Sequence, residues 1–204
     1  MKRIAPILMI ALFIHGVTSA QETLSVKSVK ASIQGTSSLH DWESAITQIE
    51  FRGVIQMESG LPKVIKDVQV SIPVKTIKSS EGKMMDNKTY DAFQSDTYPT
   101  ITFVVSQSQV VVDQAKNISI KAPGKLTMAG TTKAVIVEAR GKVLPNGNLQ
   151  LAVAHKINMT EFNMKPPTAM LGTIKVGEAV TVVVDLILNT SHQVTTGSTQ
   201  VRFE

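Results

Sequence analysis

Residues 180–188 read Val-Thr-Val-Val-Val-Asp-Leu-Ile-Leu, and every second side chain in this stretch is aliphatic. The even positions carry Val180, Val182, Val184, Leu186 and Leu188. Because successive side chains of a β-strand point to opposite faces, this period of two predicts a strand with one buried face. The odd positions, which include Thr181 and Asp185, are then expected to face outward.

The same alternation recurs along the chain and predicts about eight strands. The segments that show it are residues 24–33, 49–55, 68–74, 101–105, 118–128, 135–137, 149–157 and 180–188. In the first segment, Leu24 and Val26 are out of phase with Ala31, which predicts a β-bulge between them. Short turns such as Asn146-Gly147 separate most of the segments, so neighbouring strands are expected to be antiparallel.

One connection, from Thr76 to Tyr98, is longer and predicts a short helix. Asp86 is its expected N-cap, and Tyr90, Ala92 and Phe93 would give it an apolar side. The expected class is therefore all-β, an antiparallel barrel of about eight strands with this helix in the long connection. A sandwich of two sheets would produce the same alternation, and the pattern does not separate the two architectures.

The first twenty residues have the order of a secretory signal peptide. Lys2-Arg3 precedes the apolar run 7–14, and the small residues 18–20 follow. A membrane-spanning helix would need about 20 apolar residues, which is far more than this run contains. The predicted organisation is a signal peptide at 1–20, a barrel domain at 21–189 and a mobile tail at 190–204. We therefore expect a periplasmic or secreted protein.

The composition argues against several classes of function. The chain has no cysteine, which excludes disulfides, a thioether lipid anchor and zinc–thiolate sites. Loss of Lys2 and Arg3 lowers the formal net charge from +5 to +3, and the lysines are scattered, so nucleic acid is not an expected partner. His40, His155 and His192 lack the spacing of metal ligands, and no Gly-rich phosphate loop precedes a helix.

Two histidines are candidates for polar contacts. His40 precedes Asp41, but adjacent side chains on an extended chain point opposite ways and do not easily pair for general-base chemistry. A turn with a capping Asp41 and an anchoring Trp42 is the simpler interpretation. His155 shares the parity of Val153 and is expected to face inward, where a structural hydrogen bond would be needed. Contact with a polar ligand head is the alternative role for His155.

A cluster of methionines precedes the last strand. Met159, Met164 and Met170 lie near Phe162 around Pro166-Pro167. Because methionine adapts to irregular apolar shapes, such a cluster suits the mouth of a cavity for a flexible chain. A loop that plugs the end of the barrel is an equally good interpretation.

Four segments follow one another along the chain: G-T-S-S-L-H-D-W at 35–42, Y-P-T-I-T-F at 98–103, G-K-L-T-M-A-G-T-T-K at 124–133, and M-T-E-F-N-M-K-P-P-T-A-M-L-G-T-I-K-V-G-E at 159–178. In this order they resemble the YceI-like family of lipid- or polyisoprenoid-binding proteins. The resemblance implies a lipocalin-like barrel whose apolar cavity holds a long isoprenoid or similar amphiphile. It also implies export, usually to the periplasm. It transfers no catalytic motif.

The expected function is that of an exported, non-enzymatic carrier of a long-chain isoprenoid or similar lipid, for transport, storage or stress-related sequestration. It is expected to need no cofactor and no metal, and a membrane surface is its expected transient contact. From strand parity, the apolar lining is predicted to comprise Phe51, Ile101, Phe103, Leu126, Met128, Phe162, Met164, Met170, Val182 and Val184. The predicted head-group contacts are His40, Trp42 and His155.

Two alternatives stay open at this point, and so does the oligomeric state. One is an enzyme acting on a small substrate, with His155 or His40 as base. The other is an interaction protein of the cell envelope with a solidly packed barrel.

Overall fold

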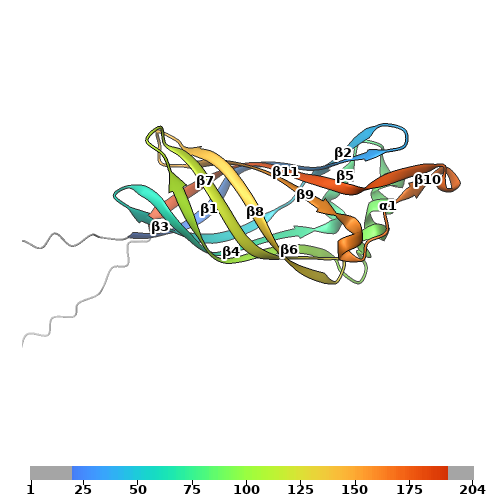
Figure 1. Ribbon diagram of the computed structural model, residues 1–204, viewed down its shortest axis with the longest axis horizontal. Coiled ribbons are helices and arrows are strands. Elements are labelled where there is room, and N and C mark those ends of the chain that lie inside the picture. Colours follow the sequence, from blue (N-terminus) through green and yellow to red (C-terminus); the bar gives the residue numbers. More distant parts are fainter. Residues whose placement is uncertain (1–19, 193–204) are drawn as a thin grey trace, which may run out of the picture.

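The computed structural model describes residues 20–192, which form a closed antiparallel β-barrel with one short α-helix (Figure 1). The ladder passes through β1, β3, β4, β6, β7, β8, β9 and β11, and β11 pairs back with β1. These eight strands are β1 (Ala20–Ser37), β3 (Glu50–Glu58), β4 (Leu61–Pro73), β6 (Thr100–Val112), β7 (Asn117–Met128), β8 (Thr131–Val143), β9 (Leu149–Asn158) and β11 (Ile174–His192). The predicted barrel is confirmed, and the closed ladder excludes the sandwich.

The remaining elements gather at one end of the barrel, on the right of Figure 1. They are β2 (Asp41–Ile46), η1 (Val74–Thr76), β5 (Ile77–Ser79), α1 (Lys83–Phe93), η2 (Met159–Phe162), β10 (Thr168–Ala169) and η3 (Met170–Gly172). Between residues 20 and 192, no helix has the length and apolar character needed to cross a bilayer.

The alternation in β11 has the predicted parity. Its even residues from Val180 to Leu188 face the barrel interior, whereas Thr181 and Asp185 do not. The predicted bulge in β1 is confirmed as well, because the register with β11 shifts between Val26 and Ser28. The bulge keeps apolar side chains inward on both sides of the shift.

Two-residue turns close two of the hairpins. Ser59-Gly60 joins β3 to β4, and Ala129-Gly130 joins β7 to β8, all four with positive φ. Positive φ at both central residues matches the twist of the flanking strands, which is why glycine occurs here. The Asn146-Gly147 turn lies in a longer loop, 144–148, in which the Asn146 side chain accepts a hydrogen bond from the Asn148 N–H at 3.2 Å.

The predicted helix in the long connection is confirmed as α1, but its predicted N-cap is wrong. The helix begins at Lys83, after Gly82, so Asp86 lies inside the first turn. There its buried carboxylate accepts the Ser79 N–H at 2.7 Å and lies 3.6 Å from Lys78 Nζ. Asp86 therefore ties the helix to β5 rather than capping it. Phe93 is buried, as expected for the apolar side.

The predicted domain limits fall close to the ends of the described residues. β11 continues to His192, so the predicted tail would start after the strand rather than at residue 190. Residues 1–19 and 193–204, which hold most of the predicted signal peptide and tail, lie outside the described residues.

Candidate functional site

The barrel encloses a cavity of about 470 Å³, within the range of roughly 300–1,000 Å³ that is usual for small-ligand pockets. Every strand of the barrel contributes side chains to its wall. A cavity of this size that all eight strands line shows that the barrel is hollow.

The two ends of the cavity differ. At the end away from α1, Val105, Leu149 and Leu188 line the cavity and are almost fully buried. At the α1 end, the lining residues Leu39 and Met84 are 67% and 65% exposed. The cavity is therefore closed at one end and opens beside α1, β10 and the turn between β1 and β2.

The turn between β1 and β2 forms one side of this mouth. The Ser37 hydroxyl donates to the His40 carbonyl at 2.8 Å and accepts the His40 N–H at 3.1 Å. His40 Nδ1 lies 2.7 Å from the Asp41 carbonyl oxygen, and Trp42 Nε1 donates to the Thr36 carbonyl at 3.0 Å. Trp42 anchors the turn as expected, but Ser37 takes the capping role that was predicted for Asp41.

The Trp42 ring also explains why residue 35, its partner in the ladder between β1 and β2, is a glycine. A Cβ atom at Gly35 would lie 2.4 Å from the Trp42 ring, so a larger residue would displace the indole. The turn is fixed to β11 as well, because the Ser38 N–H donates to the Lys175 carbonyl at 2.9 Å. His40 and Trp42 both line the mouth.

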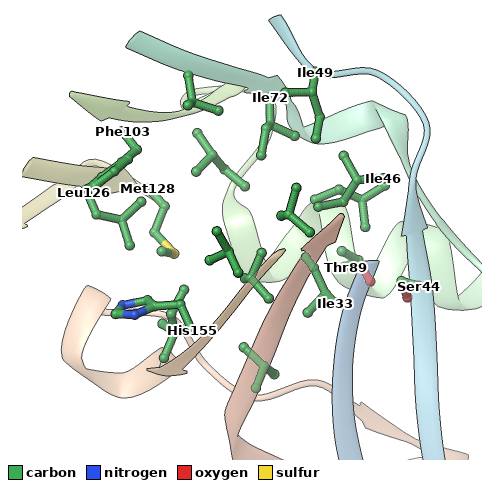
Figure 2. A pocket seen from close by; sticks show the side chains of 18 of the residues that line it. Ile33, Ser44, Ile46, Ile49, Ile72, Thr89, Phe103, Leu126, Met128 and His155 are labelled. Atoms are coloured by element: carbon green, nitrogen blue, oxygen red, sulfur yellow. The ribbon is translucent and has the colours of Figure 1, made fainter. Parts of the chain in front are cut away.

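Most of the predicted apolar lining residues do line the cavity. They are Phe51, Ile101, Phe103, Leu126, Met128, Met164, Val182 and Val184, of which Figure 2 labels Phe103, Leu126 and Met128. Phe162 is buried but lies outside the lining, because η2 places its ring 5.9 Å from Lys133 Nζ of β8. Met170 begins η3, and its side chain lies outside the described part of the chain.

Gly124 shapes the middle of the cavity. Its missing side chain matters because a Cβ there would lie 2.6 Å from both Phe103 Cε2 and the Val104 carbonyl oxygen. The aromatic ring of β6 therefore crosses over β7 at this glycine. The close approach explains the Pro123-Gly124 interruption within the alternation of β7.

The sequence analysis missed the lining residues that α1 and β2 contribute at the mouth. They are Met84, Met85 and Thr89 of α1, and Ser44 and Ile46 of β2. β2 was not predicted, because its first residues, Asp41 and Trp42, had been interpreted as part of a turn. The adjacent pair Met84-Met85 in an otherwise polar segment was the signal that could have indicated an apolar contact for α1.

His155 is the polar side chain that β9 contributes to the described lining. It lies between Val153 and Ile157 on the cavity-facing side of β9, opposite Val182 in the ladder with β11. Figure 2 shows the His155 imidazole among the side chains that line the pocket. Burial lowers the pKa of the His155 imidazole below its ordinary value of 6.5. Within residues 20–192, no group forms a hydrogen bond with this ring.

The other polar lining residues sit at the mouth, and the lining contains no lysine or arginine among the described residues. The polar ones are Ser37, His40, Trp42, Ser44, Ser79, Glu81, Thr89 and Thr168. Across the described chain, no group of three or more His, Asp or Glu side chains is placed to hold a metal ion. The cavity therefore offers a long apolar wall, with His155 on β9 and the remaining polar groups, which include the buried Ser44, toward the end that carries α1.

A family model described as a YceI-like domain matches residues 17–188. BcnA from Burkholderia cenocepacia superimposes with a TM-score of 0.62 and 21% identity, over 80% of this chain and 99% of BcnA. A polyisoprenoid-binding domain from Saccharophagus degradans gives 0.60 and 11% identity, over 85% of this chain and all of that domain.

The YCEI protein of Campylobacter jejuni gives a TM-score of 0.50 and 17% identity, over 95% of this chain and 100% of that protein. At these identities the structural likeness shows the fold alone. No curated protein sequence matches the chain.

Proposed function

Because the chain belongs to the YceI-like family, we propose that it is a carrier that holds a long-chain isoprenoid or similar amphiphilic lipid inside its barrel. The observation that carries this proposal is the hollow interior, an apolar cavity of about 470 Å³ that is closed at one end. The polyisoprenoid-binding domain from Saccharophagus degradans, which shares the fold, supports the class of ligand.

The energetics of such a carrier rest on the hydrophobic effect. Burial of a methylene group is worth roughly 0.8 kcal/mol. Ten buried methylenes would therefore supply about 8 kcal/mol before the ordering costs of binding are subtracted. A lipid can be held in this way without a covalent bond or a metal.

The proposed role is non-catalytic. An enzyme would need several polar groups converging on one substrate position, whereas His155 has apolar neighbours on its own strand and on β11. The proposal includes export to the periplasm or beyond the cell. Its support is the signal-peptide order of residues 1–20 and the start of β1 at Ala20, beside the expected cleavage site.

Narrowing the cavity tests the carrier proposal. Leu126→Trp adds bulk to a lining residue of β7, whereas Lys125→Trp adds the same side chain to the exposed neighbouring position. We expect the delipidated wild type and Lys125→Trp to take up a fluorescent isoprenoid analogue. Leu126→Trp should bind it at least about tenfold more weakly and cost no more than about 1–3 kcal/mol of stability.

Thermal melting of the delipidated proteins separates loss of binding from loss of fold. If the wild-type protein takes up no analogue, and Leu126→Trp only lowers the melting temperature, the interior does not serve as a lipid site and the carrier proposal is wrong.

A further inference from the structure

The barrel has a seam between β8 and β9. The ladder that joins these strands ends at the pair Ala139–Val153. Beyond it, residues 131–138 of β8 pair only with β7, and residues 154–158 of β9 pair only with β11. In Figure 1 the two strands diverge toward the end that carries α1. We call residues 134–138 and 154–158 the β8–β9 seam.

Two contacts join the start of β8 to the segment that follows β9, at the outer limit of the seam. Lys133 Nζ of β8 lies 3.4 Å from Glu161 Oε2 of η2. Asn163, directly after η2, donates through Nδ2 to the Thr131 hydroxyl at 3.0 Å. These contacts tie η2 and the residue after it to the start of β8.

His155 lies within this seam. If the ladder continued in register, His155 would face Val137, and both side chains line the cavity. Figure 2 shows the imidazole on the cavity side, in the same region as Leu126 and Met128. A polar group that faces an apolar cavity without a protein partner is free to form a hydrogen bond with a ligand. A bound ligand can supply the partner that the described residues do not.

A second break in the ladder serves as an internal comparison. Residues 25–30 of β1 pair with neither β2 nor β3, since those ladders begin at Ala31 and end at Leu24. The cavity-facing side chains there are Val26 and Val29, which are apolar. A broken ladder alone does not bring a polar group into the cavity, so the histidine distinguishes the β8–β9 seam.

The charges of the lining restrict the ligand. No lysine or arginine among the described residues reaches the cavity, and its acidic lining residue, Glu81, lies at the mouth. An anionic head inside would lack a compensating cation, which is unfavourable in an apolar environment. A neutral imidazole has one donor and one acceptor and can pair with an uncharged polar group.

We propose that the polar head of the cargo lies in the β8–β9 seam and forms a hydrogen bond with the His155 imidazole. The cargo is then an amphiphile with an uncharged hydroxyl, carbonyl or amide head, and its apolar tail extends toward the closed end of the barrel. This inference rests on the proposed carrier function and specifies the ligand class and the residue that selects it.

Three C15 isoprenoids that differ only at the head test the proposal: farnesol, farnesyl phosphate and the headless hydrocarbon farnesene. Each competes with a fluorescent isoprenoid analogue for the full-length protein and its variants. His155→Leu should weaken farnesol binding about 3- to 10-fold, the effect of one net hydrogen bond, and leave farnesene binding unchanged. Farnesyl phosphate should bind the wild type more weakly than farnesol.

Two variants accompany this measurement. His155→Gln, which keeps a donor and an acceptor, should retain most of the farnesol affinity. Lys156→Leu, at the next, outward-facing position of β9, should leave it unchanged. If His155→Leu fails to fold, a measurement on the wild-type protein alone tests the proposal. The ring ¹⁵N resonances of His155 should then shift on addition of farnesol but not of farnesene.

The outcomes separate the two proposals. If the wild type binds none of the three compounds, the carrier function itself is wrong. If it binds farnesol and His155→Leu binds it equally well, or if farnesyl phosphate binds most tightly, only the assignment of the head group to His155 is overturned. If His40→Leu loses farnesol affinity and His155→Leu does not, the head lies at the mouth, and the assignment of the head group to His155 is again overturned.

Discussion

His155 and His40 are both lining residues, but their surroundings give them different chemistry. His40 is exposed at the mouth, with Nδ1 at 2.7 Å from the Asp41 carbonyl. His155 is half-buried among aliphatic side chains, and burial lowers its pKa. Strand parity predicted the inward direction of His155. It could not predict that the expected structural hydrogen bond is missing among the described residues, because partners come from other strands.

The lowered pKa of His155 predicts a specific dependence of stability on pH. Above about pH 6.5 the imidazole is neutral in the folded and unfolded states and contributes no pH dependence. Below this value the unfolded chain binds the proton more readily than the folded protein does. Stability is therefore lost as the pH falls from 6.5 toward the folded-state pKa.

His155→Gln cannot titrate and should lack this part of the acid destabilisation. The measurement is the free energy of unfolding of the delipidated wild type and the variant between pH 7.5 and 5. A difference between the two that does not change with pH would show that burial leaves the His155 pKa unaltered.

Strands β8 and β9 lie close together along one part of their length and are unpaired along the rest. Where the ladder is intact, a Cβ at Gly141 would lie 1.8 Å from the Gln150 carbonyl oxygen. A few residues farther along, the same strands separate at the seam. Glycine at 141 thus permits the tight approach, and η2 follows β9 at the end where the two strands have separated.

This geometry predicts a graded response to Gly→Ala substitutions. Gly141→Ala meets backbone, which cannot move aside, and should cost about 3 kcal/mol or more. Gly53→Ala meets side chains alone, Val68 at 3.2 Å and the Phe51 ring at 3.5 Å, and should stay within about 1 kcal/mol of the wild type. Urea unfolding of both variants measures the difference. Equal losses would show that β8 does not approach β9 as closely as described.

At the scale of the whole molecule, the first and last described strands close the barrel. β1 pairs with β11 from Glu22 with His192 to Ser37 with Val176. The chain therefore encloses its cavity only after both ends of the domain are present. Because β1 begins at Ala20, cleavage after that residue would leave the closing strand almost complete.

The exported protein is accordingly expected to start at Gln21 or within a few residues of it. N-terminal sequencing of the protein recovered from the periplasm or medium provides the measurement. A change of Ala20 to a bulky residue such as Ala20→Phe should slow processing, because signal cleavage requires small residues at this position. Recovery of a membrane-bound protein that retains Met1 would contradict both export and cleavage.

Local patterns in the sequence were sufficient to predict the strands of the barrel and their inward faces. The alternation at 180–188 and the phase shift after Val26 depend on the two-residue period of an extended backbone, which does not depend on the partner strand. The helix in the long connection was also predictable. Its N-cap was not, because Asp86 is used in a contact with β5 that lies outside the helix.

Only the tertiary structure decided that the strands close into a hollow barrel, that Phe162 packs beneath Lys133 rather than into the cavity, and that His155 lies in a seam. Each of these depends on pairing between residues that are distant in sequence, such as Ala31 with Val184. The period of a strand specifies which face is apolar, but it does not specify which strand lies next to it. For this reason the same alternation allowed a sandwich, a packed barrel and the hollow barrel that forms.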